Sequence, residues 1–241
     1  MTDRSNGSGA EGPRGRFITF EGGEGAGKST QVRRLAARLQ ERGIEVVATR
    51  EPGGSPKAEA LREVLLSGAG QRFGAAGEAI LFSAARIDHI DRTIEPALAR
   101  GAWVISDRFA DSTRAYQGAL GKLDPRFILE LERISIGRTR PDLTIFLDIP
   151  PEAGLLRISK RRNGDPADRF ESEGMEFHTA LRKAFGEIAR AEPERCVTVN
   201  ALAPEDEVAE VIWREVETRV LEEVSKRPRR TRRKPKSEER R

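Results

Sequence analysis

The stretch from Phe17 to Thr30, FITFEGGEGAGKST, decides the fold of this chain. Its apolar start predicts a short buried strand, and its glycine-rich centre matches the pattern G-x-x-x-x-G-K-[ST] at Gly22, Gly27, Lys28 and Ser29. Apolar residues then recur at helical spacing, at Val32, Leu35, Ala36 and Leu39. An ordinary glycine-rich turn is the alternative, but a strand before the match and a helix after it favour a phosphate-binding loop.

This loop has the residue types that a nucleotide requires. Its glycines let backbone N–H groups surround phosphate oxygens at the positive end of a helix. Lys28 would reach the β- and γ-phosphates, and the Ser29 hydroxyl would hold Mg²⁺. We therefore predict ATP and Mg²⁺ as ligands. The predicted ATP-binding residues are Gly22, Gly23, Glu24, Gly25, Ala26, Gly27, Lys28, Ser29 and Thr30.

The length of 241 residues suits one large domain. Charge is unevenly distributed along it. Residues 226–241 hold ten Lys or Arg against two Glu, whereas the whole chain has a net charge of only +4. The remainder is therefore net acidic, so nucleic-acid binding is not expected of the domain. Our predicted division is a disordered extension at 1–15, one folded domain at 16–224 and a disordered basic tail at 225–241. The tail would touch anionic partners weakly at most.

The composition also indicates a compartment. Cys196 is the single cysteine, so no internal disulfide is possible, and His89 and His178 form no metal-ligand pattern with it. No apolar run approaches the roughly 18 residues of a membrane span, and residues 1–15 lack the apolar centre of a signal peptide. These features predict a cytoplasmic protein without a membrane partner.

Four more short apolar runs follow the first strand, at residues 44–49, 102–106, 143–149 and 196–200. Helical patterns lie between them, at about 56–66, 77–100, 112–119 and 125–136. One more helix begins after Pro151, another ends near Ala191, and a last helix begins at about Pro204, after the fifth run. Strands that alternate with helices predict an α/β fold with a five-stranded parallel sheet. Between the helix that begins after Pro151 and the helix that ends near Ala191, residues 157–171 are rich in arginine and break the apolar pattern. This predicts a mobile segment, here called the lid.

Charged residues follow the predicted strands at the edge where parallel sheets bind ligands. Arg50 ends the second strand, and Asp107 and Arg108 end the third. An Asp-Arg pair in this position commonly forms a structural ion pair. Its location opposite the phosphate loop favours a functional role, with Asp107 as a second contact to Mg²⁺.

Several classes of phosphate-loop protein are excluded by their missing motifs. The N-K-x-D guanine reader of GTPases is absent, and LSGAGQ at 66–71 lies too close to the loop for the L-S-G-G-Q signature of transporters. The strand before Asp107 lacks the acidic pair of motor ATPases. A small-molecule kinase remains.

Within that class the chain resembles the bacterial thymidylate kinases. The matching motifs span residues 16–200, in the family's order, and are FEGGEGAGKST, REPGG at 50–54, LFSAAR at 81–86, DRF at 107–109, STRAYQG at 112–118, PDL at 141–143 and DRFE at 168–171. The resemblance implies a nucleoside-monophosphate-kinase-like fold with an arginine-rich lid. It also implies transfer of the γ-phosphate of ATP to dTMP, for dTTP and DNA synthesis, by a homodimer.

The resemblance implies roles for individual residues. Phe82 would stack on thymine, and Arg86 and Thr113 would bind its polar edge. Tyr116 would exclude a 2′-hydroxyl. The residues implied near the acceptor phosphate or the sugar are Arg50, Arg108 and Glu24. From pattern alone, Phe82 would be assigned to the core and Tyr116 to helix packing.

The resemblance implies a further arginine supplied either by the phosphate loop or by the lid. The loop has no arginine at its variable positions 23–26, so we expect the lid to supply it. Arg161 is the leading candidate, with Arg157, Arg162 and Arg169 nearby; a solvated charged loop is the alternative. The predicted catalytic set is Lys28, Asp107, Arg108 and Arg161. Two rival functions stay open, a kinase for another nucleoside or nucleoside monophosphate, and a nucleotide-gated protein that binds nucleic acid through its tail.

Overall fold

Five parallel strands in the order β2-β3-β1-β4-β5 form the centre of the computed structural model, which describes residues 14–162 and 169–222. The strands are β1 (Phe17–Glu21), β2 (Val46–Arg50), β3 (Trp103–Asp107), β4 (Leu143–Asp148) and β5 (Cys196–Asn200). Each lies within two residues of its predicted range, so the predicted parallel sheet is confirmed. In the central strand, Ile18 lies opposite Ile105 of β3 and Leu143 of β4.

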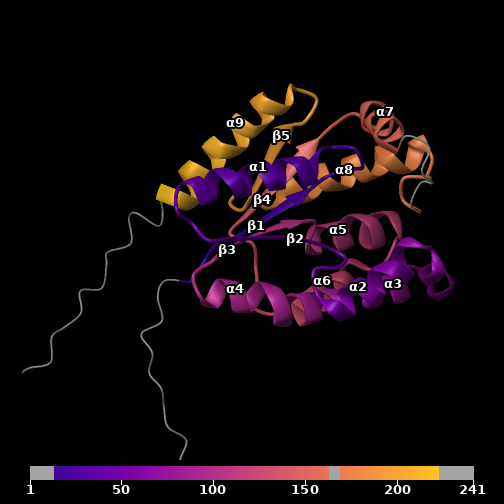
Figure 1. The fold of residues 1–241 in the computed structure, drawn as a ribbon. Helices are drawn as coiled ribbons and strands as arrows, with labels where there is room; N and C mark the ends of the chain where they lie inside the picture. The colour runs from indigo at the N-terminus through magenta and orange to yellow at the C-terminus, as the bar shows by residue number, and fades with distance from the viewer. Residues whose placement is uncertain (1–13, 163–168, 223–241) are drawn as a thin grey trace, which may run out of the picture.

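Helices cover both faces of the sheet, as Figure 1 shows. They are α1 (Lys28–Glu41), α2 (Pro56–Leu66), α3 (Gly74–His89), α4 (Glu95–Ala99), α5 (Ala110–Thr113), α6 (Pro125–Ile136), α7 (Pro151–Arg162), α8 (Met175–Ala191) and α9 (Glu205–Val216). Short 3₁₀ or π-helical segments are Ala69–Phe73, Ile90–Ile94, Arg114–Leu120 and Glu217–Leu221. The helix predicted at 77–100 is therefore α3 and α4 joined by one π-helical turn.

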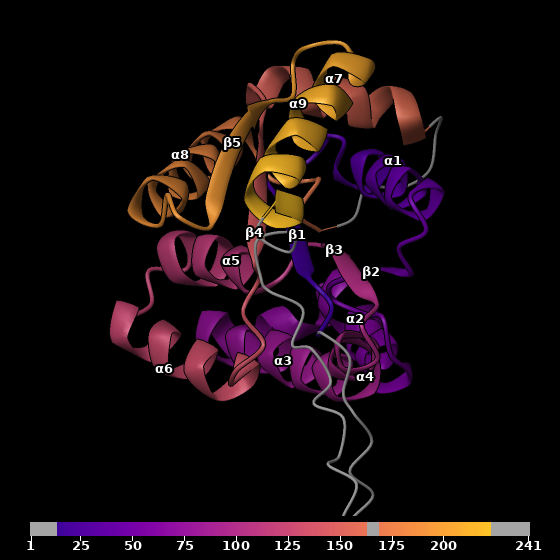
Figure 2. The ribbon, with the colours of Figure 1, turned by 90° about the vertical axis from the view of Figure 1, so that its left-hand side faces the viewer.

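The two faces of the sheet carry separate cores, because side chains alternate along a strand. Ile18 and Phe20 of β1 pack with α1 and α9, where Val32 and Ile212 are buried. Phe17 points to the other face and packs with the helical segments around Ile94. Figure 2 shows the outcome, with α2, α3, α4 and α6 grouped apart from α1, α7 and α9.

The structure corrects the predicted start of the lid. Helix α7 continues through Arg162, although the break in the apolar pattern placed the segment's beginning at Arg157. Arginine and lysine are good helix formers, and Ile158 is buried, so this turn keeps an apolar anchor. Residues 163–168 and the side chain of Arg162 lie outside the described part of the chain.

Residues 14 and 15 lie just before the predicted domain boundary at residue 16 and contact the domain. Gly15 N–H donates to Leu98 C=O at 2.9 Å, and both guanidinium nitrogens of Arg14 donate to the Glu95 carboxylate. Residues 1–13 and 223–241, which include the predicted basic tail, lie outside the described residues. Within the described ranges, every helix is too short or too polar to span a bilayer.

Two neighbouring helices expose apolar side chains in a pattern that we did not predict. Ile80 and Ile87 are exposed on α3, and Phe127 and Ile134 are exposed on α6. Each pair is seven residues apart, so its members share one face of their helix. The same helices also carry apolar residues that face the core, so the sequence alone does not distinguish the exposed apolar residues from the buried ones.

Candidate active site

The phosphate loop joins β1 to α1 with the conformation that its sequence predicts. Gly22 and Gly27 have φ of 132° and 89°, a region that residues with a Cβ seldom adopt. Lys28 is buried, and its Nζ donates to the carbonyl oxygens of Gly22 and Gly23 at 3.1 and 2.8 Å. Burial lowers the pKa of Lys28, with a further contribution from Arg108. The ammonium is thus held inside the turn, next to the backbone that would surround phosphate.

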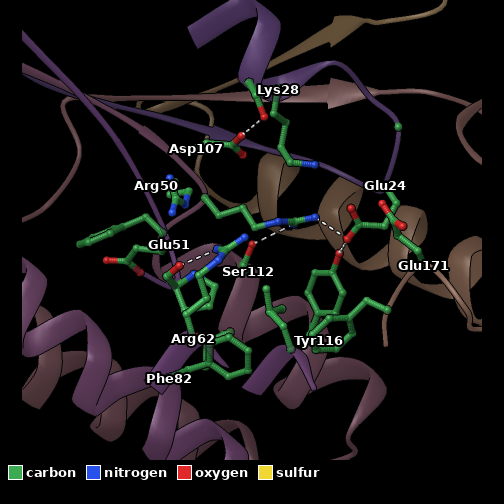
Figure 3. A pocket seen from close by; sticks show the side chains of 18 of the residues that line it. Glu24, Lys28, Arg50, Glu51, Arg62, Phe82, Asp107, Ser112, Tyr116 and Glu171 are labelled. Carbon is green, nitrogen blue, oxygen red and sulfur yellow. Dashed lines mark hydrogen bonds and ion pairs between the residues drawn. The ribbon is translucent and has the colours of Figure 1, made fainter. Parts of the chain in front are cut away.

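A cavity of about 260 Å³ opens beside this loop, at the carboxyl ends of β1, β2 and β3. All the residues predicted for the acceptor line it: Glu24, Arg50, Phe82, Arg86, Arg108, Thr113 and Tyr116. It is also lined by Gly25, Gly27, Lys28, Ser29, Thr30, Asp107 and Arg161 from the other predictions. Figure 3 shows Lys28 and Asp107 at one end and Phe82 at the other. Of the predicted loop residues, Gly22, Gly23 and Ala26 line neighbouring cavities instead.

Arg108 crosses the middle of the cavity. Its Nη2 donates to Glu24 Oε1 at 2.5 Å, and its Nη1 donates to Gly22 C=O at 3.2 Å. The Tyr116 hydroxyl donates to the same Glu24 oxygen at 2.7 Å. Burial disfavours the Glu24 charge, but Arg108, Lys28 and Tyr116 outweigh it and lower the pKa of Glu24 to about 2. The Asp-Arg motif therefore does not form the structural ion pair weighed above, since Arg108 pairs with the loop.

Asp107 makes a different contact. Its Oδ2 accepts a hydrogen bond of 2.5 Å from the Ser29 hydroxyl at the start of α1. A carboxylate and a hydroxyl fit Mg²⁺, which commonly keeps several waters and takes few protein ligands beside substrate phosphates. The described residues contain no cluster of three His, Cys, Asp or Glu that would make a fuller metal cage. The donor set at the loop therefore fits a metal shared with a nucleotide.

The end of the cavity away from the loop combines an aromatic surface with buried polar groups. Phe82 is half-buried on α3 and lines the cavity, so its side chain is available to a ligand. Arg86, one turn later, donates through Nε to Glu51 Oε2 at 2.8 Å and through Nη2 to Thr113 Oγ1 at 3.1 Å. Arg86 is buried, so these contacts fix its guanidinium in place.

The second strand supplies a more exposed cation. Arg50 is mostly exposed, and its Nη2 lies 3.1 Å from both carboxylate oxygens of Glu59. An exposed pair of this kind contributes little to stability. Arg50 can therefore exchange Glu59 for a phosphate group at small cost.

The structure separates the lid arginines. Arg161 lines the cavity, and its Nη2 donates to Glu171 Oε1 at 2.9 Å. Arg157 donates to Ala201 C=O at 2.9 Å, on the far side of the phosphate loop. Arg169 pairs with Glu78 of α3, and both residues line a neighbouring cavity. Arg161 alone of these three reaches the cavity beside the loop.

Sequence reasoning assigned no role to several residues that line the cavity. Phe170 packs edge-on against Tyr116, with ring centroids 5.0 Å apart, and faces Phe82 at 6.5 Å. The others are Glu51, Pro52, Arg62, Leu66, Phe109, Ser112, Gln117 and Glu171. Most of them belong to quoted motifs, so membership of a motif was the available signal. Arg62 and Leu66 lie on α2 outside any motif and carried no signal.

The chain is similar to known proteins in its family pattern and in its whole sequence. The family model described as thymidylate kinase matches residues 20–212. A thymidylate kinase of Rhodopseudomonas palustris is 57% identical over 210 residues, which cover 87% of this chain and 91% of the relative. One from a Bradyrhizobium strain is 54% identical over 212 residues, which cover 88% and 94% of the two chains.

A solved structure is also similar. The thymidylate kinase of Ehrlichia chaffeensis matches with a TM-score of 0.68 and 33% identity, over 85% of this chain and 99% of that chain. The predicted nucleoside-monophosphate-kinase-like fold is thereby confirmed, since sequence, family model and structure agree. The chain belongs to the thymidylate kinase family.

Proposed function

We propose that this protein transfers the γ-phosphate of ATP to dTMP and produces dTDP and ADP, with Mg²⁺ bound at the phosphate loop. One observation carries the proposal: a single cavity joins the phosphate loop to an aromatic surface at Phe82. Six cationic side chains line that cavity, Lys28, Arg50, Arg62, Arg86, Arg108 and Arg161. An aromatic face suits a nucleobase, and guanidinium groups suit phosphate oxygens.

The donor nucleotide would reach the loop from the side opposite dTMP. A separate cavity of about 320 Å³ lies there, and Gly25, Gly27, Thr30 and Arg161 line both cavities. Lys28 and the loop N–H groups would bind the donor phosphates. Ser29 and Asp107 would hold Mg²⁺, which neutralises phosphate charge when bound.

The acceptor would lie along the other cavity. Phe82 would stack on thymine, with Arg86 and Thr113 at its polar edge. Arg50 and Arg108 would bind the 5′-phosphate, and Tyr116 would lie against the sugar. The fixed Arg86 and the movable Arg50 suit these two tasks, because base recognition requires rigid donors and phosphate capture tolerates motion.

In the reaction, an oxygen of the acceptor phosphate attacks the γ-phosphorus of ATP as the bond to the ADP oxygen breaks. The attacking phosphate is already an anion, so no general base is needed. The protein's contribution is to align the two phosphates and neutralise their charge. Arg161 would supply the lid cation between them, because it is the lid arginine that borders both cavities.

The test is ADP production with ATP, Mg²⁺ and one acceptor at a time: dTMP, thymidine, UMP, CMP, AMP or GMP. The proposal predicts a strong preference for dTMP. Preference for another acceptor would keep the kinase and reject the assignments of Phe82, Arg86, Thr113 and Tyr116. No turnover, with DNA binding that depends on residues 226–241, would favour the nucleotide-gated binding protein.

The same proposal includes a homodimer. The exposed stripe of Ile80, Ile87, Phe127 and Ile134 on α3 and α6 supports it, because an apolar face on paired helices is typical of a protein interface. We expect sedimentation at micromolar concentration to give a dimer. Ile134→Glu should give a monomer, while Leu156→Glu, at an exposed residue of α7, should leave the dimer intact. A monomeric wild-type protein would refute this part.

A further inference from the structure

A fully buried carboxylate, Glu21, ends β1 directly before the phosphate loop, and none of the roles above uses it. Its Oε1 accepts hydrogen bonds from Phe109 N–H at 2.8 Å and Ser112 N–H at 3.2 Å. Its Oε2 accepts one from the Ser112 hydroxyl at 2.7 Å. One donor belongs to Phe109, in the turn between β3 and α5, and two belong to Ser112 of α5, so Glu21 ties this turn and the helix after it to the central strand.

This turn holds Arg108 in an unusual backbone conformation. Arg108 has φ of 72°, a value that side chains with a Cβ adopt only when their surroundings enforce it. Arg108 N–H donates to Phe20 C=O at 2.8 Å, and the Ser106 hydroxyl donates to Arg108 C=O at 2.7 Å. Glu21 binds the next N–H along the chain, that of Phe109. These bonds surround Arg108 and fix the direction in which its side chain leaves the backbone.

Glu21 also acts on the guanidinium itself through Ser112. The Ser112 hydroxyl donates its proton to Glu21 and therefore turns its lone pairs outward. Arg108 Nη1 donates to that oxygen at 3.2 Å. Figure 3 shows Ser112 between the labelled loop residues and the base end of the cavity. The chain of contacts runs from a buried carboxylate, through a hydroxyl, to the cation in the middle of the site.

We propose that Glu21 is a positioning residue for acceptor binding: through Ser112 and the Phe109 N–H it sets both the backbone and the guanidinium of Arg108. The inference rests on the proposed function, in which Arg108 binds the acceptor phosphate. The alternative is that Glu21 only stabilises the fold. The two differ in what they predict, because a positioning role acts on the acceptor and not on ATP.

Two variants separate the contacts of Glu21. Glu21→Gln keeps an oxygen for the two backbone N–H groups but places an NH₂ group opposite Ser112, which reverses that hydrogen bond. Ser112→Ala removes the hydroxyl and leaves the carboxylate in place. Thr19→Val is the matched control, because Thr19 lies on the same strand as Glu21 and is equally buried, and its hydroxyl makes a 2.8 Å hydrogen bond to the Thr144 hydroxyl of β4. Thr19 is not among the residues that line the cavity.

The measurement is steady-state kinetics with dTMP and ATP varied in turn, with dTMP binding by calorimetry in the absence of ATP. We expect Glu21→Gln and Ser112→Ala each to raise the KM and Kd for dTMP about tenfold, the change expected for one hydrogen bond to a charged group. The KM for ATP should stay within about twofold. The double variant should be no worse than either single variant, since both act through one hydroxyl.

Three results would overturn the proposal: an equal effect in Thr19→Val, an equal rise in the KM for ATP, or additive effects in the double variant. Failure of the proposed function looks different. In that case the wild-type protein itself would neither bind nor phosphorylate dTMP, and Arg108 would have no acceptor phosphate for Glu21 to serve.

Discussion

The Tyr116 hydroxyl donates to Glu24 Oε1 at 2.7 Å, and that oxygen also accepts from Arg108. A residue of the π-helical segment after α5 is thereby joined to the phosphate loop across the cavity. The Tyr116 ring is buried and packs against Phe170, so its position is fixed on two sides. Tyr116 therefore connects the proposed sugar subsite with the phosphate loop.

This relationship predicts different results for two substitutions of Tyr116. Tyr116→Phe keeps the ring and should preserve the preference for dTMP over the 5′-monophosphate of ribothymidine, with at most a several-fold rise in the KM for dTMP. Tyr116→Ala removes the ring and should reduce that preference by about tenfold or more. The check is kcat/KM for both acceptors. Equal preference in wild type and Tyr116→Ala would refute the sugar assignment.

Substitution of Lys28 is expected to change catalytic activity and thermal stability in different ways. Its burial lowers the pKa of the ammonium, so the folded protein bears a cost for this charge. Lys28→Met keeps the length of the side chain and removes the charge. We expect kcat to fall by about a hundredfold or more, as for loss of one preorganised donor to a developing charge, while the midpoint of thermal unfolding stays or rises.

A parallel fall in kcat and in thermal stability for Lys28→Met would instead assign Lys28 a structural role. Arg33→Met is the control, because Arg33 lies on the same helix and is exposed. That variant should retain wild-type activity.

The lid arginines predict a graded series. Arg161→Ala should reduce kcat by about a hundredfold or more and leave the Kd for ATP nearly unchanged, because this cation is expected to act on charge that develops in the transition state. Arg169→Ala removes the pair with Glu78 and should mainly raise the KM for dTMP, since Phe170 loses its anchor beside the base. Single-turnover kinetics would check both.

Arg157→Ala is the control for Arg161→Ala, because both residues lie on α7. Its contact is with Ala201 C=O, beyond the phosphate loop, so its effect should fall on ATP and not on dTMP. If Arg161→Ala left kcat unchanged, the lid assignment would be wrong.

Glu21 predicts a pH dependence of stability. Burial, with the nearby charge of Asp111, raises the pKa of Glu21 from 4.5 to about 7, although Ser112, Arg108 and the Phe109 N–H act in the opposite direction. The folded protein therefore binds this proton more tightly than the unfolded chain does. The stability that it contributes is complete below pH 4.5 and is lost as the pH rises through about 7.

The corresponding measurement is urea unfolding at pH 5.5 and 8.5. The pKa shift predicts that Glu21 contributes about 2 kcal/mol to the loss of wild-type stability between these pH values. Glu21→Gln should show a pH dependence smaller by that amount. Identical slopes for the two proteins would show that Glu21 does not titrate in this range. Lys28, Arg108 and Asp111 face Glu21, so each must be kept unchanged in the comparison.

Sequence patterns predicted the strands well, because each strand is a short run of apolar residues and each run here begins directly after a charged residue or a glycine. They predicted the lid poorly. The run RISKRR from Arg157 to Arg162 interrupts the apolar pattern but forms helix, and the buried side chain of Ile158 anchors it to the core. A charge-rich helical turn and a charged loop look alike when only hydropathy is read.

The division within the site has a physical cause. The sequence by itself determined the phosphate loop, the order of strands and helices, and the residue types that follow the strands, because these depend on local spacing along the chain. Only the tertiary structure decided the pairings. Arg108 pairs with Glu24 and not with Asp107. Arg161 lines the cavity, while Arg157 and Arg169 do not. Glu21 binds the backbone N–H that follows Arg108. Such pairings join residues about 10 to 90 positions apart, and the packing of β1, β3 and the lid sets them.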